Sequence, residues 1–562
     1  MTKRLLLSVA ALALGAGLLV TAAVAAKSPS KAAKPNAKAA AGKTGGTLRV
    51  NLQSDTDYVD PALAYYQTSW QFEYATCAKL LNYPDKAAPA GSQLQPELAT
   101  SMPRVSADGK TYTFTIKSGK QAYHFNTGQA VTAANVAYAI QRDLNPKMQS
   151  PAASFLTDIL QGAEAYNSGK ANSISGVQVK GNTLTIKLIK PSPDLLARLA
   201  MPFFCAIPAN LPIVPEGVHS LPGAGPYYVA SWTPNRQIVL KRNPRYKGPR
   251  PHNLDNIVYT VGVDLNATLL QVKQAQADYA GDGVPPAAYA GLGQQYGVNK
   301  TQFYVNPTLS FRYLALNTSR PLFSNVKLRQ AVGYAIDRPT LIRNRGKYAG
   351  IRADHYLPNG LPGSPKNQSV KVGAAGYPLV GANPAKAKQV AGSISGNPTA
   401  VLYTCNAGVC PINAQVIQYN LKQIGINVDV KQFVRGVQFQ KEGVKGEPFD
   451  IAYEGWIADY ADPFDFINIL LDGSTIHETN NVNFSYFNNP TYNKKMQDAA
   501  RLSGSARYSS YAKLDIDLSK NQAPLQSWTF DTQRDFFSSK VDPKCVTYQP
   551  VYTMDLAALC LK

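Results

Sequence analysis

The sequence predicts an α/β protein with more than one lobe. Segments 111–117 and 183–189 alternate apolar and polar residues, which is typical of a sheet with one covered face. Segments 313–316 and 401–403 are almost continuously apolar, which favours sheets covered on both faces. Helical segments lie between these strands. About 515 residues follow the amino-terminal tail, which is more than one ordinary domain contains. We therefore expect two or three lobes.

Three expected helices begin at capping residues. Thr132 precedes a segment whose apolar residues recur every four positions. Asn325 begins a second amphipathic segment, and Asn383, followed by proline, begins a third. Residues 399–430 then have the order strand, helix, strand, with a proline at the helix start and a glycine at its end. This order predicts a β-α-β unit with parallel strands and a right-handed crossover.

The amino terminus is typical of an exported protein. Lys3 and Arg4 precede residues 5–26, which are uncharged, mostly apolar and end in small residues, so 1–26 predicts a signal peptide. An uncleaved membrane anchor is the alternative, because an apolar segment of this length can span a bilayer. Residues 27–46 are rich in Lys, Ala, Pro and Gly, which predicts a flexible spacer. We therefore expect a periplasmic, cell-surface or extracellular protein, with no lipid anchor because no cysteine lies near the cleavage site.

Six cysteines in an exported chain favour disulfides. Cys405 and Cys410 flank a short glycine-containing turn, and Cys545 and Cys560 both lie near the carboxyl terminus. This leaves Cys77 to pair with Cys205. A thiolate metal site is the alternative, but the chain has no CxxC motif and no cluster of Cys and His. We expect no metal and no cofactor.

The basic charge suits an anionic cell envelope better than a nucleic acid. The formal net charge is +22, and about +15 of it lies outside the amino-terminal tail, spread over the rest of the chain. No dense block of Lys and Arg is present, and an exported protein does not ordinarily meet nucleic acid. We expect no nucleic-acid partner.

The segment GWIADYADP, residues 455–463, is the candidate binding site. It follows an expected strand at 449–454, and side chains at strand ends converge on ligands in α/β folds. Asp459 and Asp462 could also form a catalytic carboxylate pair, as in glycosidases. The structural alternatives are that Asp459 caps a turn and that Asp462 fixes the backbone before Pro463. For Asp462 we favour the structural interpretation.

Recognisable hydrolase motifs are missing. The sequence has no GxSxG and no HExxH motif. Its five histidines occur singly and are expected to be surface or packing residues; they are His124, His219, His252, His355 and His477. We therefore do not expect an enzyme, and a secreted carboxylate-dependent hydrolase is kept only as a less favoured alternative.

From residue 47 to the carboxyl terminus the chain resembles the bacterial extracellular solute-binding proteins of family 5, which serve peptide and nickel ABC importers. Six segments in the same order carry the resemblance: VDPAL at 59–63, DGKTYTFTIKSGKQAYHFNTGQAVTAANV at 108–136, GAGPYYVASW at 223–232 with the following LKRNPRYKG, VKLRQAVGYAIDR at 326–338, YPLVGANPAKAKQV at 377–390, and GWIADYADPFDF at 455–466. Two places in the second of these segments depart from the family pattern. Asn126 and Thr127 stand where Asp-Gly is usual, and Asn135 where Asp is usual.

The resemblance implies a type II periplasmic-binding-protein-like fold, with two ligand-gripping lobes, an extra lobe and closure about a hinge. Lobe I then comprises 47–90, 208–308 and 526–562, lobe II is the extra lobe at 91–207, and lobe III is 309–525.

The resemblance also implies ligand-binding residues. Asp459 matches the aspartate that holds the ligand's α-amino group in peptide-binding relatives, Trp456 matches the aromatic of that motif, and Tyr460 is adjacent to the aspartate. Tyr65, Tyr66 and Trp70 lie in a loop that lines the cleft in relatives. Core packing is the alternative role for each of these three aromatics.

The implied function is capture of a solute, most simply a di- or oligopeptide, and its delivery to an ABC permease with ATPase subunits. An oligosaccharide, a metal chelate or an opine-like molecule is the alternative cargo. We expect the protein to act as a monomer.

Overall fold

The computed structural model describes residues 43–365, 371–394 and 396–562. The expected signal peptide and most of the spacer lie outside them. Residues 43–46, which belong to the expected spacer, already contact lobe I, because Lys43 bridges to Leu561 and the Gly45 N–H donates to the carbonyl of Asn253. No helix within the described ranges is both long and apolar enough to cross a membrane.

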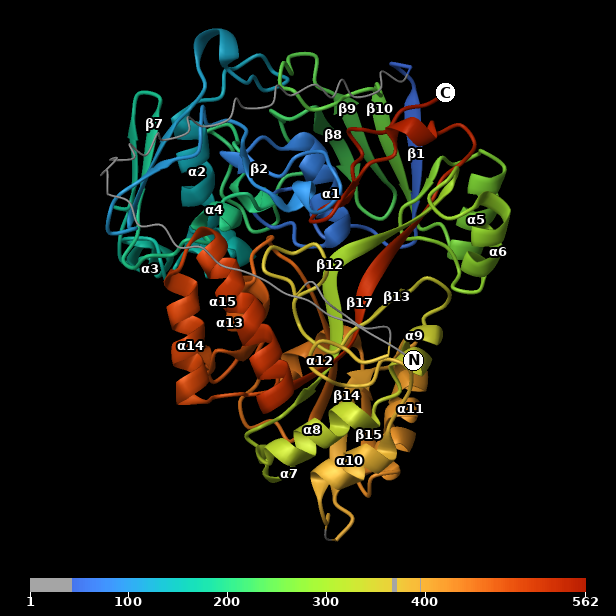
Figure 1. Ribbon diagram of the computed structural model, residues 1–562. Coiled ribbons are helices and arrows are strands. Elements are labelled where there is room, and N and C mark those ends of the chain that lie inside the picture. The colour runs from blue at the N-terminus through green and yellow to red at the C-terminus, as the bar shows by residue number, and fades with distance from the viewer. Residues whose placement is uncertain (1–42, 366–370, 395) are drawn as a thin grey trace, which may run out of the picture. The chain divides into compact units, whose positions relative to one another are not determined.

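Lobe I is built on a five-stranded sheet in the order β11-β1-β10-β9-β8 (Figure 1). The strands are β1 (Thr47–Leu52), β8 (Tyr227–Thr233), β9 (Gln237–Arg242), β10 (Asn256–Val261) and β11 (Tyr279–Ala280). β1 is parallel to β10 and β11, and the other pairs are antiparallel. Its core also takes Met554, Leu556 and Leu559 from the carboxyl terminus, so distant segments of the chain form one lobe.

Further elements of lobe I surround this sheet. They are α1 (Gln67–Thr76), β2 (Leu81–Asn82), α5 (Leu265–Lys273), α6 (Ala288–Tyr296), β18 (Tyr548–Gln549) and β19 (Thr553–Met554).

Lobe II has a four-stranded antiparallel sheet in the order β4-β5-β7-β6. Its elements are β3 (Gln95–Pro96), β4 (Arg104–Val105), β5 (Thr111–Thr115), α2 (Ala133–Asp143), α3 (Ala163–Asn167), β6 (Val177–Lys180), β7 (Thr183–Lys187) and α4 (Leu195–Arg198). Thr132 caps α2 in a capping box with Asn135, as its position before the apolar period predicts. Asn135 therefore has a structural role here.

Lobe III has a six-stranded sheet in the order β13-β17-β12-β16-β14-β15. The strands are β12 (Phe303–Leu316), β13 (Gly350–Arg352), β14 (Thr399–Cys405), β15 (Asn427–Phe433), β16 (Ile451–Ile457) and β17 (Leu525–Phe536). β14 and β15 are parallel and are joined through α11 (Cys410–Lys422), which confirms the predicted β-α-β unit. β16 is also parallel to β14, so the carboxyl ends of three neighbouring strands meet at one edge.

Helices cover this sheet. They are α7 (Pro321–Ser324), α8 (Val326–Ala335), α9 (Arg338–Arg343), α10 (Pro384–Ala391), α12 (Arg435–Glu442), α13 (Phe464–Leu471), α14 (Pro490–Arg501) and α15 (Gly504–Asp517). Asn325 and Asn383 cap α8 and α10 through side-chain oxygens that accept backbone N–H groups, as predicted.

Two long antiparallel strands connect lobe I with lobe III (Figure 1). One end of the β12–β17 ladder lies beside Tyr279 of lobe I, where Phe537 forms a bridge, and the other end holds Leu314 and Trp528 in the core of lobe III. The register shifts between Pro307 and Phe311, so the ladder is interrupted between the lobes. Such a crossing is where a hinge between lobes can act.

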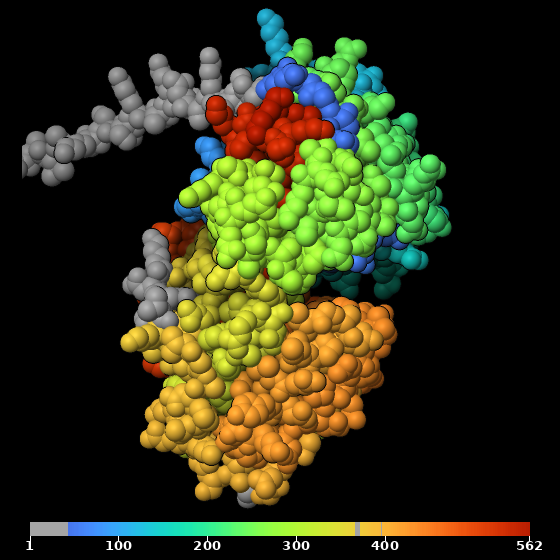
Figure 2. All heavy atoms as spheres, turned by 90° about the vertical axis from the view of Figure 1, so that its right-hand side faces the viewer, coloured from blue at the N-terminus to red at the C-terminus, as the bar shows by residue number. Residues whose placement is uncertain are grey.

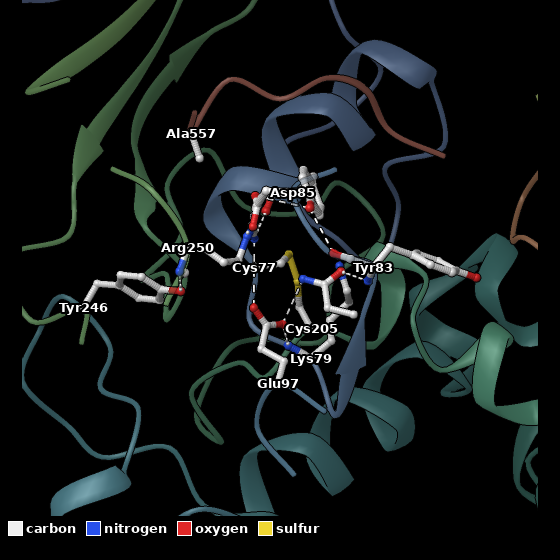
Figure 3. A network of polar contacts seen from close by, with 12 residues as sticks. Cys77, Lys79, Tyr83, Asp85, Glu97, Cys205, Tyr246, Arg250 and Ala557 are labelled. Carbon is white, nitrogen blue, oxygen red and sulfur yellow. Dashed lines mark hydrogen bonds and ion pairs between the residues drawn. A yellow bond between two sulfur atoms is a disulfide. The ribbon is translucent and has the colours of Figure 1, made fainter. Parts of the chain in front are cut away.

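Lobes I and II are joined by a disulfide and a buried ionic cluster (Figure 3). The Lys79 backbone N–H donates to Glu97 over 2.8 Å, and Arg250 Nε lies 3.1 Å from Asp85. Lys79 Nζ faces the ring of Tyr552 at 4.9 Å, and burial lowers the pKa of Lys79 to about 7. These contacts fix the junction from which lobe II extends.

The cysteines pair as Cys77–Cys205, Cys405–Cys410 and Cys545–Cys560, the pairing expected from the sequence. Asp542 lies close to the sulfurs of Cys545 and Cys560, but both sulfurs are consumed by the disulfide. The described part of the chain therefore offers no thiolate metal site there.

Candidate functional site

The strand that carries the candidate motif is longer than the sequence predicts. We expected it at 449–454, but β16 runs to Ile457, because β12 continues as its antiparallel partner and pairs Phe311 with Trp456 and Ser310 with Ile457. Trp456 is therefore a strand residue rather than a loop residue. Asp459 follows the strand by two residues, at the edge where the carboxyl ends of β14, β15 and β16 meet.

Asp459 lies where the three lobes meet. Its carboxylate Oδ1 accepts a hydrogen bond from the phenol of Tyr65 in lobe I over 3.0 Å. Asp459 is only 8% exposed. Its backbone N–H donates to Oδ2 of Asp465 over 2.9 Å, and Trp456 Nε1 donates to the same oxygen over 3.4 Å. Asp465, on the first turn of α13, is fully buried directly behind Asp459.

The two acids form a buried pair without a cationic partner. Burial raises the pKa of Asp459 to about 7, although the hydrogen bond from the Tyr65 phenol opposes the shift. Burial, followed by repulsion from Asp459, raises the pKa of Asp465 well above its ordinary range. Among the described residues, no Lys, Arg or His side chain forms an ion pair with either carboxyl group. A cation supplied from outside would complete this site.

The aromatic loop before α1 is positioned by an acid that the sequence interpretation missed. Asp57 Oδ2 accepts the backbone N–H groups of Tyr65 and Tyr66, over 2.6 and 2.9 Å. The Tyr65 ring packs against Trp70 at 5.7 Å and against Phe203 of lobe II at 5.5 Å, which directs its phenol toward Asp459. A short acid a few residues before a loop is a common pattern, so Asp57 carried no specific signal in the sequence.

The expected aromatic residues have different roles. Tyr65 and Tyr66 are 41% and 62% exposed and are available to a ligand. Trp70 is 5% exposed and its indole N–H donates to the carbonyl of Ala64, so it supports the loop.

Tyr460 is fully buried and does not join the exposed aromatics. Its phenol donates to Asp194 of lobe II over 3.2 Å, and its expected contact with a ligand stays a prediction.

Asp462 is structural, as the interpretation that we favoured has it. Its carboxylate makes a two-pronged ion pair with Arg507 on α15, over 2.6 and 3.0 Å, and accepts the N–H of Phe464. This pair fixes the loop that carries Asp459. Asp462 therefore has its own cation, in contrast to Asp459 and Asp465.

A polar cavity of about 280 Å³ lies beside the hinge strands, and Ile457, two residues before Asp459, is part of its lining. Its walls include Gln67 of α1, residues 281–283 of lobe I, Ile457 and parts of β12 and β17. In Figure 2, a recess separates the green surface of lobe I from the orange surface of lobe III on the face toward the viewer.

The cavity is rich in guanidinium groups. Arg312 and Arg345 both pair with Asp531, and Arg534 stacks over the ring of Tyr289 at 4.0 Å. One carboxylate thus balances two guanidinium groups, and a third lies beside them. Sequence reasoning missed these arginines because they come from separate strands and a loop that meet only in the fold.

The comparisons agree with this architecture. The profile described as bacterial extracellular solute-binding proteins, family 5 Middle, matches residues 93–478. The dipeptide-binding protein DppE of Bacillus subtilis (strain 168) is 26% identical over 461 residues, covering 79% of this chain and 80% of the relative. Heme-binding protein A of Haemophilus influenzae is 26% identical over 486 residues, covering 83% of each chain.

Solved structures show the same fold. The clavulanic acid biosynthesis oligopeptide binding protein 2 superposes with a TM-score of 0.82 at 23% identity, covering 92% of this chain and 96% of that one. The fold is therefore the α/β, periplasmic-binding-protein-like type II fold that the sequence predicts. The chain belongs to the bacterial extracellular solute-binding proteins of family 5.

Proposed function

We propose that this protein captures a peptide with a free α-amino group and delivers it to the permease of an ABC importer. The observation that carries the proposal is the buried pair of Asp459 and Asp465, which has no cationic partner among the described residues. An ammonium group is a fitting partner, because a hydrogen bond to an ionised acceptor contributes about 1.5 to 3 kcal/mol and gains strength as water leaves.

The cavity beside the hinge strands suits the rest of such a cargo. Peptide carbonyls and a carboxylate are hydrogen-bond acceptors, and Arg312, Arg345 and Arg534 supply three guanidinium groups against the two lining acids Asp531 and Asp282, of which only Asp531 pairs with arginine. The exposed rings of Tyr65 and Tyr66 offer apolar contact near the amine end. Amine and carboxylate groups of one ligand would then lie at opposite ends of the cleft.

Capture is coupled to closure. A ligand that contacts Asp459 of lobe III together with lobe I binds the closed form more tightly, and so shifts the equilibrium toward it. The β12–β17 crossing is the hinge of this motion. Recognition of the closed form by the permease and hydrolysis of ATP by partner subunits complete transport by an exported, monomeric protein at an anionic envelope.

A cargo without an amine is the second candidate, because one relative carries the name heme-binding protein. An oligosaccharide, a chelate or an opine-like molecule would use Trp456 and Tyr66 for stacking and would not need Asp459.

Calorimetry on the full chain tests the choice. Trialanine and N-acetyltrialanine are titrated into the wild type, into Asp459→Asn and into a matched surface control, Asp498→Asn. We expect Asp459→Asn to weaken trialanine at least tenfold and to leave the acetylated peptide unchanged. Equal losses for both peptides, or no preference of the wild type for the free amine, would rule out the amine clamp. Native mass spectrometry of protein from its own host then identifies any co-purified cargo.

A further inference from the structure

Asp465 is a second acid in the site that the resemblance does not assign. It lies six residues after Asp459 and receives the Asp459 backbone N–H and the Trp456 indole N–H on the same oxygen, Oδ2. Its other oxygen, Oδ1, is buried and has no donor among the described residues. Repulsion from Asp459 also raises the pKa of Asp465, because the two carboxyl groups lie close together.

This arrangement fits a carboxylic acid better than a carboxylate. An acid has one oxygen that accepts, which corresponds to Oδ2, and one that carries its own hydrogen and needs no donor, which corresponds to Oδ1. Two carboxyl groups in contact cannot both be ionised without a strong penalty, and here neither has a cation. An ionised Oδ1 would be a buried, unsatisfied charge.

The proton belongs on Asp465 rather than on Asp459. Asp465 is fully buried, whereas Asp459 is 8% exposed and accepts the Tyr65 phenol, which stabilises an anion there. The start of α13 and the two N–H donors favour an anion on Asp465, but burial and the adjacent Asp459 outweigh them, because the pKa of Asp465 stays well above its ordinary range.

The surrounding ionisable groups do not change this assignment. The phenols of Tyr65 and Tyr83 face the pair from lobe I, and burial raises the pKa of both well out of the physiological range. Asp462 and Tyr460 are on the same loop. Arg507 and Arg198, which lie near this loop, are already engaged, Arg507 by Asp462 and Arg198 by Asp194.

We propose that Asp465 remains a neutral carboxylic acid, with and without cargo, and that its O–H donates a hydrogen bond to the Asp459 carboxylate. Asp465 is then a positioning residue: it orients Asp459 and keeps the site at a single negative charge. One consequence rests on the proposed function: Asp459 and Asp465 together select a cargo with one cationic group at this position and not a dication.

The proposal predicts a pH profile. Only ionised Asp459 binds the amine, and its pKa is about 7, so affinity for trialanine falls about a hundredfold between the plateau and pH 5. Above about pH 8 the peptide's own α-amine loses its proton and affinity falls again. A neutral Asp465, as proposed, adds no titration of its own, so Asp465→Asn keeps the same profile.

The first experiment needs no cargo and therefore stands apart from the proposed function. Infrared difference spectra at pH 7.5 compare the ligand-free wild type with Asp465→Asn. We expect the wild type to show one additional neutral carboxylic acid band. A lost carboxylate band in its place shows an ionised Asp465 and overturns the proposal, whatever the cargo proves to be.

The second experiment measures binding. Asn at 465 keeps an acceptor oxygen and replaces the O–H by an N–H donor, so Asp465→Asn binds trialanine within about threefold of the wild type, with an unchanged pH profile. Asp465→Leu keeps neither group and binds at least tenfold more weakly, with circular dichroism checking its fold. A loss of tenfold or more in Asp465→Asn, or a shifted pH midpoint, would show that Asp465 binds the cargo as an anion. If the wild type ignores the amine, the proposed function fails while the infrared result still decides the state of Asp465.

Discussion

Removing the charge of Asp462 should lower the stability of lobe III rather than remove a group that contacts the ligand. Asp462 and Arg507 are 5% and 2% exposed and meet through two hydrogen bonds. Burial disfavours the charge of Arg507, but the Asp462 carboxylate outweighs it and raises the pKa of Arg507. Asp462→Asn leaves this guanidinium without its counter-ion.

The magnitude follows from the burial of the pair. Breaking a buried ion pair by removing one partner costs about 3 to 5 kcal/mol. Arg507 retains hydrogen bonds to backbone carbonyls such as that of Ala500, so we take the lower value. Lobe III has roughly 220 residues, and about 2.1 cal/mol/K of unfolding entropy per residue gives about 0.46 kcal/mol/K. A loss of about 3 kcal/mol then lowers the Tm of this lobe by about 6 °C.

Scanning calorimetry of Asp462→Asn, Arg507→Met and the double variant measures this effect. The double variant should lose less than the sum of the single variants, because it removes both charges of one pair. Additive losses, or a Tm change below about 1 °C in both single variants, would refute the assigned role of the pair. Asp498→Asn on the surface serves as the unaffected control.

Three further predictions concern the cleft and the junction of the lobes. Tyr65→Phe removes the partly exposed hydrogen bond to Asp459, so we expect the affinity for trialanine at pH 8 to weaken about fivefold, or about 1 kcal/mol. The pKa of Asp459 should also rise, which calorimetry across pH measures. An unchanged midpoint of the pH profile would contradict this role of Tyr65. Replacing Cys77 and Cys205 together by Ser removes a crosslink with a sequence separation of 128. The free energy of unfolding, measured with denaturant, should fall by about 3 to 4 kcal/mol. Replacing Cys405 and Cys410, which are separated by 5, should lower it less. Arg534→Gln should weaken trialanine more than its carboxyl-terminal amide; equal losses would place the peptide carboxylate elsewhere.

Local features of the fold could be predicted from the sequence. Thr132, Asn325 and Asn383 act within one helical turn, so their patterns were sufficient to place three helix starts. The β-α-β unit at 399–430 was predictable for the same reason, since its strand and helix periods and its end signals are contiguous. The extension of β16 to Ile457 was not, because its partner strand β12 lies far away in the sequence.

The same distinction between local patterns and distant contacts applies to the candidate site. Asp459 could be proposed as a site residue because a resemblance marks its motif, and Tyr65, 394 residues away, because a second motif does. Asp465 is only six residues from Asp459, yet sequence proximity says nothing about which of two acids is buried without a cation. Arg507 could not be assigned to Asp462 because it lies on another helix, 45 residues away. The contact of Tyr460 with Asp194 could not be predicted, because the two residues lie far apart in the sequence.

The contrast between Asp462 and Asp459 indicates how the cleft is switched. Both acids lie on one loop, but Asp462 is already paired with Arg507 of the same lobe, so closure of the cleft does not have to supply its cation. From lobe I, Asp459 receives one neutral phenol, worth about 1 kcal/mol, or about a fivefold bias toward closure. An ammonium group adds about 1.5 to 3 kcal/mol in the closed form, a shift of about tenfold to 150-fold. Cargo therefore dominates the equilibrium between the open and the closed cleft, because no cation of the described residues pairs with Asp459. An arginine engineered beside Asp459 should both close the lobes and exclude the peptide.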